Sequence, residues 1–478
     1  MESSPESVHP AGEAVFEFPT YGGMVVLSTT EDALTPFGGL VPWAAFQKRS
    51  EILERLVQSC PVARSSPNAT PVFDLLCGFF LNVLCEGSRF SHGERLREDP
   101  TIQKLFGLKR GVPGTDAILR FFKTISEEQG RAWVAEAARH LWSALPGKFI
   151  LDWDSTVLTR YGHQEDAEVG YNPEKRGRPS HHPLLAVVSG TRLCPYYRWR
   201  PGTSSSAGEW REAMAESLIW LGKTPWLNRG DIGFCQEKIL NWHEEESGRP
   251  HYLFKLKLTR NVQRAFAKID ESEWQGAPTL LALQVAETTL QLHGWSRPRR
   301  VVLGRRLMGT ISAERGGTFW ETCRHEYEAY VTDLSTDEAN GWQIVDLYRQ
   351  RADCENVFDE LKNHWGFSGF CSKKKEATAL AARLVLLAYN LWIFFLRLMQ
   401  PERHVEAFQG RRWFLLIAAR IVKSGRQTTL KIAATGDWWR DLKSGYERIC
   451  VWLKTTATQL RSPPSFSIPN LCTAPSPS

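Results

Sequence analysis

The sequence lacks several patterns that identify common classes of protein. Its ten cysteines include no CxxC pair and no His-rich partner spacing, which argues against a zinc site and fits reduced thiols in a cytosol. The segment SLIWLGKT at 217–224 ends like a phosphate-binding loop but has Ser217 where the first glycine should be, so we expect no nucleotide cofactor. We also find no internal repeat.

Long hydrophobic runs are scarce as well. The most apolar run, LVLLAYNLWIFFL at 384–396, lies between Arg383 and Arg397 and contains Asn390, so it suits a buried core helix better than a membrane span. The first residues, MESSPESVHPAGEAVFEFP, show neither the charged region nor the apolar region of a secretory signal. We therefore expect a cytoplasmic protein without a membrane partner.

Neither sign of charge dominates the chain as a whole. Its 59 Lys+Arg and 53 Asp+Glu give a formal net charge of +6 over 478 residues. Residues 401–478, however, hold 12 Lys+Arg against 5 Asp+Glu, a larger surplus than that of the whole chain. A basic C-terminal part suggests a polyanionic partner, although basic surfaces without one are common.

Hydrophobic periodicity divides the chain into four regions. Residues 1–37 are expected to be partly disordered, and 38–146 have a mostly helical pattern. Residues 147–400 have a mixed α/β pattern with a β-rich segment at about 259–330, and 401–478 form a basic helical region with a disordered tail. Within the first helical region, DPTIQKLFGLKRGVPGTDAILRFFK predicts helix, turn and helix, which could bind DNA but is more often scaffold.

Three acidic residues stand where the backbone would expose them. Asp154 is near the end of a predicted strand, Asp231 follows the turn-like NRG, and Glu355 lies on a predicted helix. Converging carboxylates can bind two Mg²⁺ ions, which at about 3.5–4 Å separation activate an attacking oxygen and stabilise the leaving oxygen at one phosphorus. Asp152 lies on the same strand face as Asp154, and Asp359 lies on nearly the same helix face as Glu355, so either could take the other's place. A capped turn or a surface ion pair could also explain any one of these acids.

The stretch YRQRADCENVFDELKN at 348–363 predicts a helix with two different faces. The polar residues, which fall within roughly 60° of one another, are Tyr348, Arg351, Glu355 and Lys362. The adjoining apolar arc consists of Cys354, Val357, Phe358 and Leu361. A solvated helix face with an i,i+4 ion pair would explain the polar residues. Alternatively, cations beside a catalytic carboxylate would hold the phosphates next to the scissile one.

The spacing of these four polar residues matches the Tyr-Arg-Glu-Lys signature of bacterial insertion-sequence transposases of the DDE type. Four blocks resemble that group in its order, and the resemblance runs from about residue 38 to 450. The blocks are LDWDSTV, GYNPEKRGRPSHHPLLAVVSG, NRGDIGF and LYRQRADCENVFDELKNHWGF. The resemblance implies an α/β protein with a ribonuclease H-like catalytic core and a β-rich insertion, flanked by helical N- and C-terminal regions. We expect the N-terminal helical region, 38–146, to bind DNA.

The resemblance also implies roles for the matching residues. The metal-binding catalytic acids would be Asp154, Asp231 and Glu355. The residues in contact with the transposon end would be Tyr348, Arg351 and Lys362. The implied reaction is cut-and-paste DNA transposition with Mg²⁺, for which Mn²⁺ could substitute: cleavage at terminal inverted repeats, then joining of the 3′-hydroxyl ends to target DNA. Members of this group act as homodimers on DNA. For this chain we accordingly expect a homodimer in the bacterial cytoplasm that is associated with the nucleoid when bound to DNA.

Two features depart from this pattern or add to it. The segment PWLNRG before Asp231 is less β-branched than a central strand usually is, and Gly230 directly precedes the acid. Within the insertion, Trp295 and Trp320 could each stack on an extruded base, although a core or surface role would also explain them.

Two other functions remain open on the sequence. A non-catalytic DNA-binding protein derived from a transposase would be marked by a lost acid, and all three acids are present. A structure-selective nuclease on the same fold would cut branched DNA without joining ends, and the Tyr-Arg-Lys set favours end recognition over it. His181 and His182, in EKRGRPSHHP, could approach DNA or cap a turn.

Overall fold

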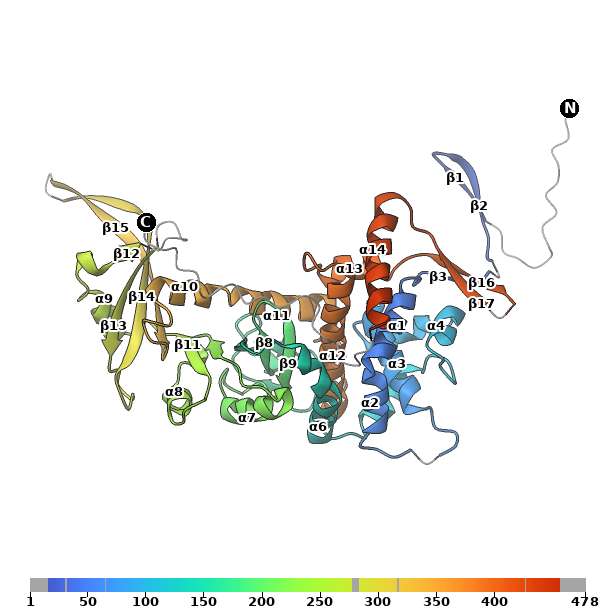
Figure 1. The fold of residues 1–478 in the computed structure, drawn as a ribbon, viewed down its shortest axis with the longest axis horizontal. Coiled ribbons are helices and arrows are strands. Elements are labelled where there is room, and N and C mark those ends of the chain that lie inside the picture. Colours follow the sequence, from blue (N-terminus) through green and yellow to red (C-terminus); the bar gives the residue numbers. More distant parts are fainter. Residues whose placement is uncertain are drawn as a thin grey trace.

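The computed structural model describes residues 16–455, apart from 31, 65, 277–282, 316, 317 and 426, and apart from the side chains of Pro100 and 309–324. The tails expected to be disordered, at 1–15 and 456–478, lie outside the described residues. Figure 1 shows an elongated molecule with a β-rich part at one end, a helical body at the other and the centre of a large sheet between them.

The large sheet has nine strands in the order β12-β13-β14-β15-β11-β10-β4-β8-β9. Five of them form its central end: β4 (Ile150–Ser155), β8 (Leu184–Val188), β9 (Leu193–Arg198), β10 (Leu227–Gly230) and β11 (His251–Lys255). Numbered along the chain, these five lie in the order 3-2-1-4-5. β4, β10 and β11 run parallel, and β8 is antiparallel to both of its neighbours.

The strands expected at about 259–330 extend this same sheet. They are β12 (Gln275–Gly276), β13 (Leu283–Leu290), β14 (Arg299–Arg315) and β15 (Thr318–Thr332). β15 pairs antiparallel with the core strand β11, which makes the β-rich segment continuous with the centre of the sheet. The ends of β14 and β15 project from the body in Figure 1.

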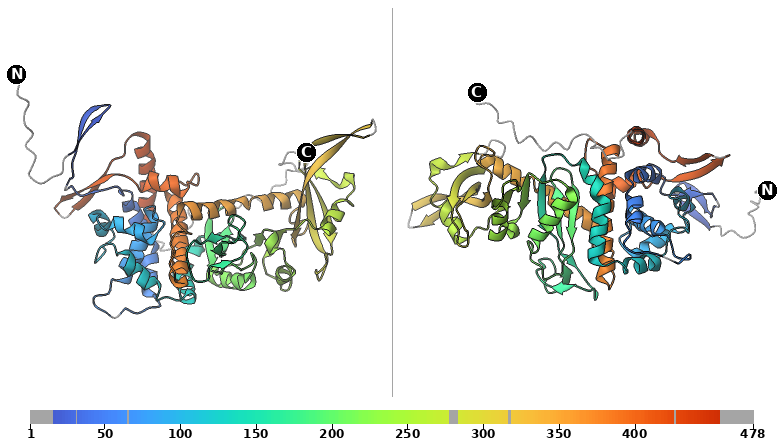
Figure 2. Two further views of the ribbon diagram at one scale, coloured as in Figure 1. Left: turned by 180° about the vertical axis from the view of Figure 1, so that it is seen from behind. Right: turned by 60° about the horizontal axis from the view of Figure 1, so that its bottom comes forward.

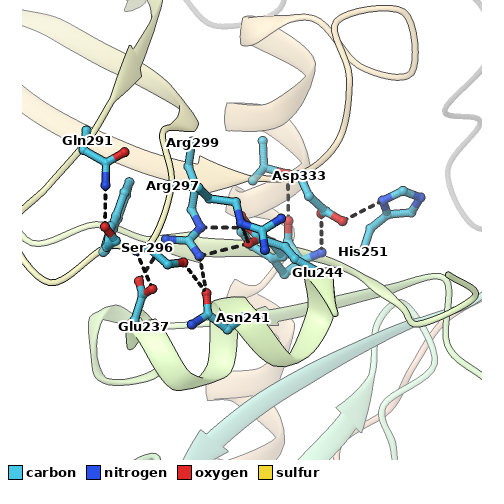
Figure 3. A network of polar contacts seen from close by, with 12 residues as sticks. Glu237, Asn241, Glu244, His251, Gln291, Ser296, Arg297, Arg299 and Asp333 are labelled. Carbon is cyan, nitrogen blue, oxygen red and sulfur yellow. Dashed lines mark hydrogen bonds and ion pairs between the residues drawn. The ribbon is translucent and has the colours of Figure 1, made fainter. Parts of the chain in front are cut away.

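A polar network fastens the start of β14 to helix α8 (Glu237–Glu244), as Figure 3 shows. The buried guanidinium of Arg299 donates to Glu244 at 2.8 Å, to Glu237 at 2.9 Å and to Asn241 at 2.7 Å. Charge-assisted hydrogen bonds of this kind are stronger than neutral ones. They therefore fix the β-rich segment against the core at a second point besides the strand pairing.

The two faces of β4 point to different helices. The ring centroid of Trp153 lies 5.9 Å from that of Trp210, at the start of α7 (Trp210–Leu221), and the Trp153 indole N–H donates to Asn228 at 3.0 Å. Because side chains alternate along a strand, Asp152 and Asp154 point to the opposite face. The helices concerned are α7 on the first face, and α10 (Gly341–Arg349) and α11 (Ala352–His364) on the second.

The two-faced helix expected at 348–363 is divided. α10 ends at Arg349 and α11 begins at Ala352, with Gln350 and Arg351 between them, although the two helices run nearly in line in Figure 1. The predicted apolar arc is confirmed, since all its members are buried: Cys354, Val357, Phe358 and Leu361.

The apolar run at 384–396 belongs to the long helix α12 (Lys375–Met399). Among the described residues this helix alone is long and apolar enough to cross a membrane, and its apolar window is entirely buried inside the protein. In Figures 1 and 2 α12 stands between the sheet and the N-terminal helices of residues 40–84, which agrees with the expected core helix.

The N- and C-terminal regions form one body around α12. The short strand β3 (Leu34–Thr35) pairs with β16 (Ala419–Ser424), and α1 (Leu40–Ser50) packs against α14 (Gly436–Leu453). The other helices are α2 (Ile52–Gln58), α3 (Val72–Leu84), α4 (Pro100–Leu105), α5 (Thr115–Phe122), α6 (Glu127–Ala138) and α13 (Ala407–Phe414). In the expected helix-turn-helix, α5 buries its apolar side chains in the core.

Two segments expected to be disordered or helical are β hairpins. In the N-terminal region, β1 (Phe16–Thr20) pairs with β2 (Gly23–Leu27). In the basic C-terminal region, β16 pairs with β17 (Gln427–Ile432), so this stretch is not helical. Its alternation of basic and apolar residues, as in ARIVKS, suits a strand as well as a helix when the run is short.

Candidate active site

The register of the central strands brings the first two acids together. β4 and β10 are parallel neighbours with Trp153 opposite Gly230, so the next pair along is Asp154 and Asp231. Neighbouring strands lie about 4.8 Å apart. Burial raises the pKa of the Asp154 carboxyl, Arg351 opposes this, and Asp231 raises the pKa further. Two carboxylates therefore share one edge of the sheet and repel each other.

Gly230 is required by the way the chain turns at Asp231. A Cβ on Gly230 would lie 2.8 Å from the Cβ and Cγ of Phe234, which is fully buried. The turn is closed by the Asp231 carboxylate, which accepts the N–H of Gly233 at 2.9 Å. The segment LNRG is a strand despite its few β-branched residues because it is buried throughout and paired on both sides.

Glu355 reaches the same place from the first turn of α11. It lines a cavity of about 370 Å³ together with Asp231. The complete lining is Asp231, Ile232, Lys255, Glu328, Tyr330, Tyr348, Arg349, Arg351, Ala352 and Glu355. Asp154 lies beside this cavity, where its carboxylate accepts a 2.5 Å hydrogen bond from Arg351. Asp231 and Glu355 thus line one cavity, with Glu355 at its exposed side, and Asp154 is linked to it through Arg351.

The three residues expected to contact DNA occupy different positions. Tyr348 lines the cavity with its ring 4.6 Å from that of Tyr330, and burial raises the pKa of its hydroxyl. Arg351 is buried, with its guanidinium directed at Asp154. Lys362 lies about two turns beyond Glu355 on α11 and is half-buried, away from the cavity lining.

The two alternative acids are placed differently. Asp152 is fully buried, and its carboxylate oxygens accept from Arg229 at 2.6 and 2.7 Å, which leaves no open side for a metal or DNA. Asp359 is exposed on α11 and accepts from Asn363 at 2.7 Å. Neither lines the cavity that holds Asp231 and Glu355.

The two histidines near the first acid are interior residues. His181 accepts from the Nε of Arg160 at 2.9 Å, and His182 pairs through Nε2 with the hydroxyl of Ser155 at 2.9 Å. Burial lowers the pKa of His181 to about 4 and also lowers that of His182. Both are buried, and His182 contacts the strand that carries Asp154.

Sequence reasoning missed four polar residues of the cavity wall: Lys255, Glu328, Tyr330 and Arg349. Glu328 and Arg349 form an ion pair at 3.0 Å. The alternation in HEYEAYV marks Glu326 and Glu328 as facing one side, but only the pairing of β15 with β11 brings that side to the acids.

Of the two tryptophans that could stack on an extruded base, the structure describes the side chain of Trp295. The guanidinium carbon of Arg299 lies 5.1 Å from the ring centroid of Trp295, which also packs against the hydrophobic core. The side chain of Trp320 lies outside the described residues. A structural role therefore accounts for Trp295.

The donor set suits a hard divalent cation, because carboxylate oxygens are the ligands that Mg²⁺ prefers. The repulsion between Asp154 and Asp231 is of the kind that a bound cation relieves. In the part of the chain that the structure describes, no three His, Cys, Asp or Glu side chains already stand close enough together to hold an ion. The three carboxylates are of the chemical type that binds Mg²⁺. To share one ion with Asp154 and Asp231, Glu355, at the exposed side, would have to approach them.

A known protein family matches most of this chain. The family model described as "Transposase DDE domain group 1" matches residues 20–450. The solved structure of a piggyBac transposase synaptic complex with hairpin DNA aligns over 87% of this chain and 82% of that chain, with 11% sequence identity and a TM-score of 0.40. A search of the curated proteins finds none that matches.

Proposed function

The chain belongs to the group 1 family of transposase DDE domains, and from this premise we propose that it is the cut-and-paste transposase of a bacterial insertion sequence with the Tyr-Arg-Glu-Lys signature. It would cleave DNA at the terminal inverted repeats of its element. It would then join the freed 3′-hydroxyl ends to target DNA. Both steps are phosphoryl transfers at a phosphodiester.

One observation carries this proposal: Asp154 and Asp231 stand side by side on parallel strands, and Glu355 lines the cavity next to them. The order of the acids along the chain and their elements, two strand ends and a helix, are those that the resemblance implies. The central strand order 3-2-1-4-5, with the second strand antiparallel, supports a ribonuclease H-like core.

We assign the three acids to binding Mg²⁺ or Mn²⁺. Such ions, when bound, lower the pKa of an attacking water and stabilise the negative charge of the leaving oxygen. The chain's own contribution is to hold the acids at a sheet edge and to line the cavity with Lys255, Arg349 and Tyr348, which can bind the phosphates on either side of the scissile bond.

The remaining assignments concern partners. Double-stranded DNA, as transposon end and as target, would be bound by a homodimer in the bacterial cytoplasm. Support for a DNA partner comes from the basic C-terminal region and from Lys362, which extends the polar face of α11 beyond the cavity. We assign no nucleotide cofactor and no membrane partner.

The test is a cleavage assay with Mg²⁺, and in parallel Mn²⁺, on DNA carrying the inverted repeats that flank this gene. Asp154→Asn, Asp231→Asn and Glu355→Gln should each abolish end-specific cleavage while end binding persists. Asp359→Asn is the matched control, because Asp359 lies one turn along the same helix with its own partner Asn363, and it should retain cleavage.

Other outcomes would overturn the proposal in different ways. A wild type that binds the ends without cutting in either metal would be a non-catalytic DNA-binding protein. A wild type that cuts branched DNA but never joins ends would be a structure-selective nuclease. Activity in Glu355→Gln together with its loss in Asp359→Asn would move the third acid to Asp359.

A further inference from the structure

The side chain of Arg351 lies between the first and the third acid of the site. Its Nη2 is 2.5 Å from Oδ2 of Asp154, and its Nη1 is 3.7 Å from Oε1 of Glu355. The arginine side chain is 6% exposed, whereas that of Glu355 is 73% exposed. The guanidinium therefore occupies the inner end of the cavity, and Glu355 approaches it from the solvent side.

Both oxygens of Asp154 have partners in this arrangement. Oδ1 accepts the backbone N–H of Ser155 at 2.7 Å, and Oδ2 accepts from Arg351. A divalent cation at Asp154 would stand beside the guanidinium. Like charges in such a partly buried place are poorly screened by water and salt, so the two cations compete for the same carboxylates.

Two other buried arginines show how a structural guanidinium is held in this chain. Arg200 donates to four backbone carbonyls, and Arg229 binds both oxygens of Asp152. Arg351 differs in two ways. It makes one short contact with the carboxylate of Asp154, and its Nε is buried with no hydrogen-bond partner among the described residues. Of the three it is held by the fewest bonds, which favours a side chain that can change partner.

We propose that Arg351 is a resident counter-ion that bridges Asp154 and Glu355 before a divalent cation binds, and that it has to leave Asp154 for the cation to be held. This inference rests on the proposed function, in which these acids bind the metal. Arg351 is then a positioning residue of the metal site. It keeps the buried carboxylate of Asp154 compensated and in place, and it weakens cation binding to the free protein.

The same movement accounts for the DNA contact expected of Arg351. A guanidinium that has left Asp154 can pair with a phosphate, whose geometry suits its planar fork. Both N–H groups of Nη2 already have acceptors, the Asp154 carboxylate at 2.5 Å and the carbonyl of Trp153 at 3.4 Å, so a phosphate bound at Nη2 would have to replace one of them. DNA that draws the guanidinium away would therefore free Asp154 for the metal, so that the metal site is completed when DNA is present.

The experiment is a calorimetric titration of the full-length protein with Ca²⁺ in the absence of DNA. Ca²⁺ takes oxygen ligands as Mg²⁺ does, and the readout is affinity and not catalysis. Arg351→Met should bind Ca²⁺ at least about tenfold more tightly than the wild type, a difference of about 1.4 kcal/mol. The control Arg440→Met removes an arginine from an exposed pair with Asp437, outside the cavity lining, and should change the affinity by less than about threefold.

A double-mutant cycle separates this inference from the proposed function. In the Asp154→Asn background, Arg351→Met should no longer tighten Ca²⁺ binding. Equal or weaker binding by Arg351→Met than by the wild type would overturn the counter-ion role and leave the metal site intact. If Asp154→Asn bound Ca²⁺ as the wild type does, the metal assignment itself would fail. Should Arg351→Met not fold, Arg351→Gln, which removes the charge and keeps an N–H donor, gives the same comparison.

Discussion

Asp152 and Arg229 form a fully buried ion pair directly beneath the acids of the site. They are register partners on β4 and β10, two residues before Asp154 and Asp231 respectively. The guanidinium of Arg229 also donates to Ser189 at 2.6 Å and to the carbonyl of Leu347 at the end of α10. One side chain thus ties two strands, the end of β8 and a helix into the platform that carries the acids.

Removing one partner of this pair should cost much stability. Arg229→Met leaves the Asp152 carboxylate buried and unpaired, and we expect the free energy of unfolding to fall by about 3–5 kcal/mol. Urea denaturation followed by circular dichroism measures it. The control Arg440→Met breaks an exposed i,i+3 pair with Asp437 and should change stability by less than about 0.5 kcal/mol. Equal effects of the two variants would contradict the structural role of the buried pair.

Gly230→Ala tests the close approach before the second acid. The added Cβ would lie 2.8 Å from Phe234, so we expect a loss of about 1–3 kcal/mol by overpacking and a displacement of Asp231 that lowers cleavage. Thermal unfolding and the cleavage assay measure the two effects. Gly147→Ala, whose Cβ would meet nothing within 4 Å, is the control and should leave both unchanged. A fully active, stable Gly230→Ala would show that the acid is positioned in some other way.

Lys362→Ala tests the proposed phosphate contact beyond the cavity. Each phosphate that a lysine neutralises contributes about 0.9 to the slope of log K against log salt, so the variant should bind transposon ends more weakly and with a slope smaller by about one. Electrophoretic mobility shifts at several salt concentrations give this slope. Lys374→Ala removes the same charge from an exposed pair with Glu165 at the start of α12, outside the parts of the chain assigned to DNA, and should leave the slope unchanged. An unchanged slope in Lys362→Ala would remove the residue from the DNA interface.

The pair of His251 and Asp333, drawn in Figure 3, predicts a pH dependence of stability. The hydrogen bond that His251 donates to Asp333 raises the pKa of His251 above its usual value near 6.5, against an opposing effect of burial. A raised histidine pKa stabilises the folded state fully below the unfolded pKa, and this stabilisation is lost as the pH rises through the folded pKa.

The wild type should therefore exceed His251→Gln in stability by up to about 1 kcal/mol near pH 5.5, and the difference should shrink towards about pH 8.5. Urea denaturation at several pH values checks this. His163→Gln, at an exposed position, is the control. A difference that grew with pH would reverse the sign and exclude the assigned ion pair.

Much of the site could be predicted because its parts are local. Asp154 on a strand, Glu355 on a helix with its apolar arc, and the buried helix at 384–396 follow from periodicity within a few turns or residues. The hairpin of β16 and β17 could not be predicted this way, since a run of six residues satisfies the helix and the strand pattern equally.

By itself the sequence determined which residues could carry the chemistry, the type of most elements around them, and the membership of a transposase DDE family. Only the tertiary structure decided which of the 53 acids lie near one another. A shift of one residue in the register of β4 against β10 would turn every side chain to the other face, and nothing near Asp154 in the chain specifies that register. The bond from Arg351 to Asp154 joins residues 197 apart, so it exists only once the sheet and α11 have packed.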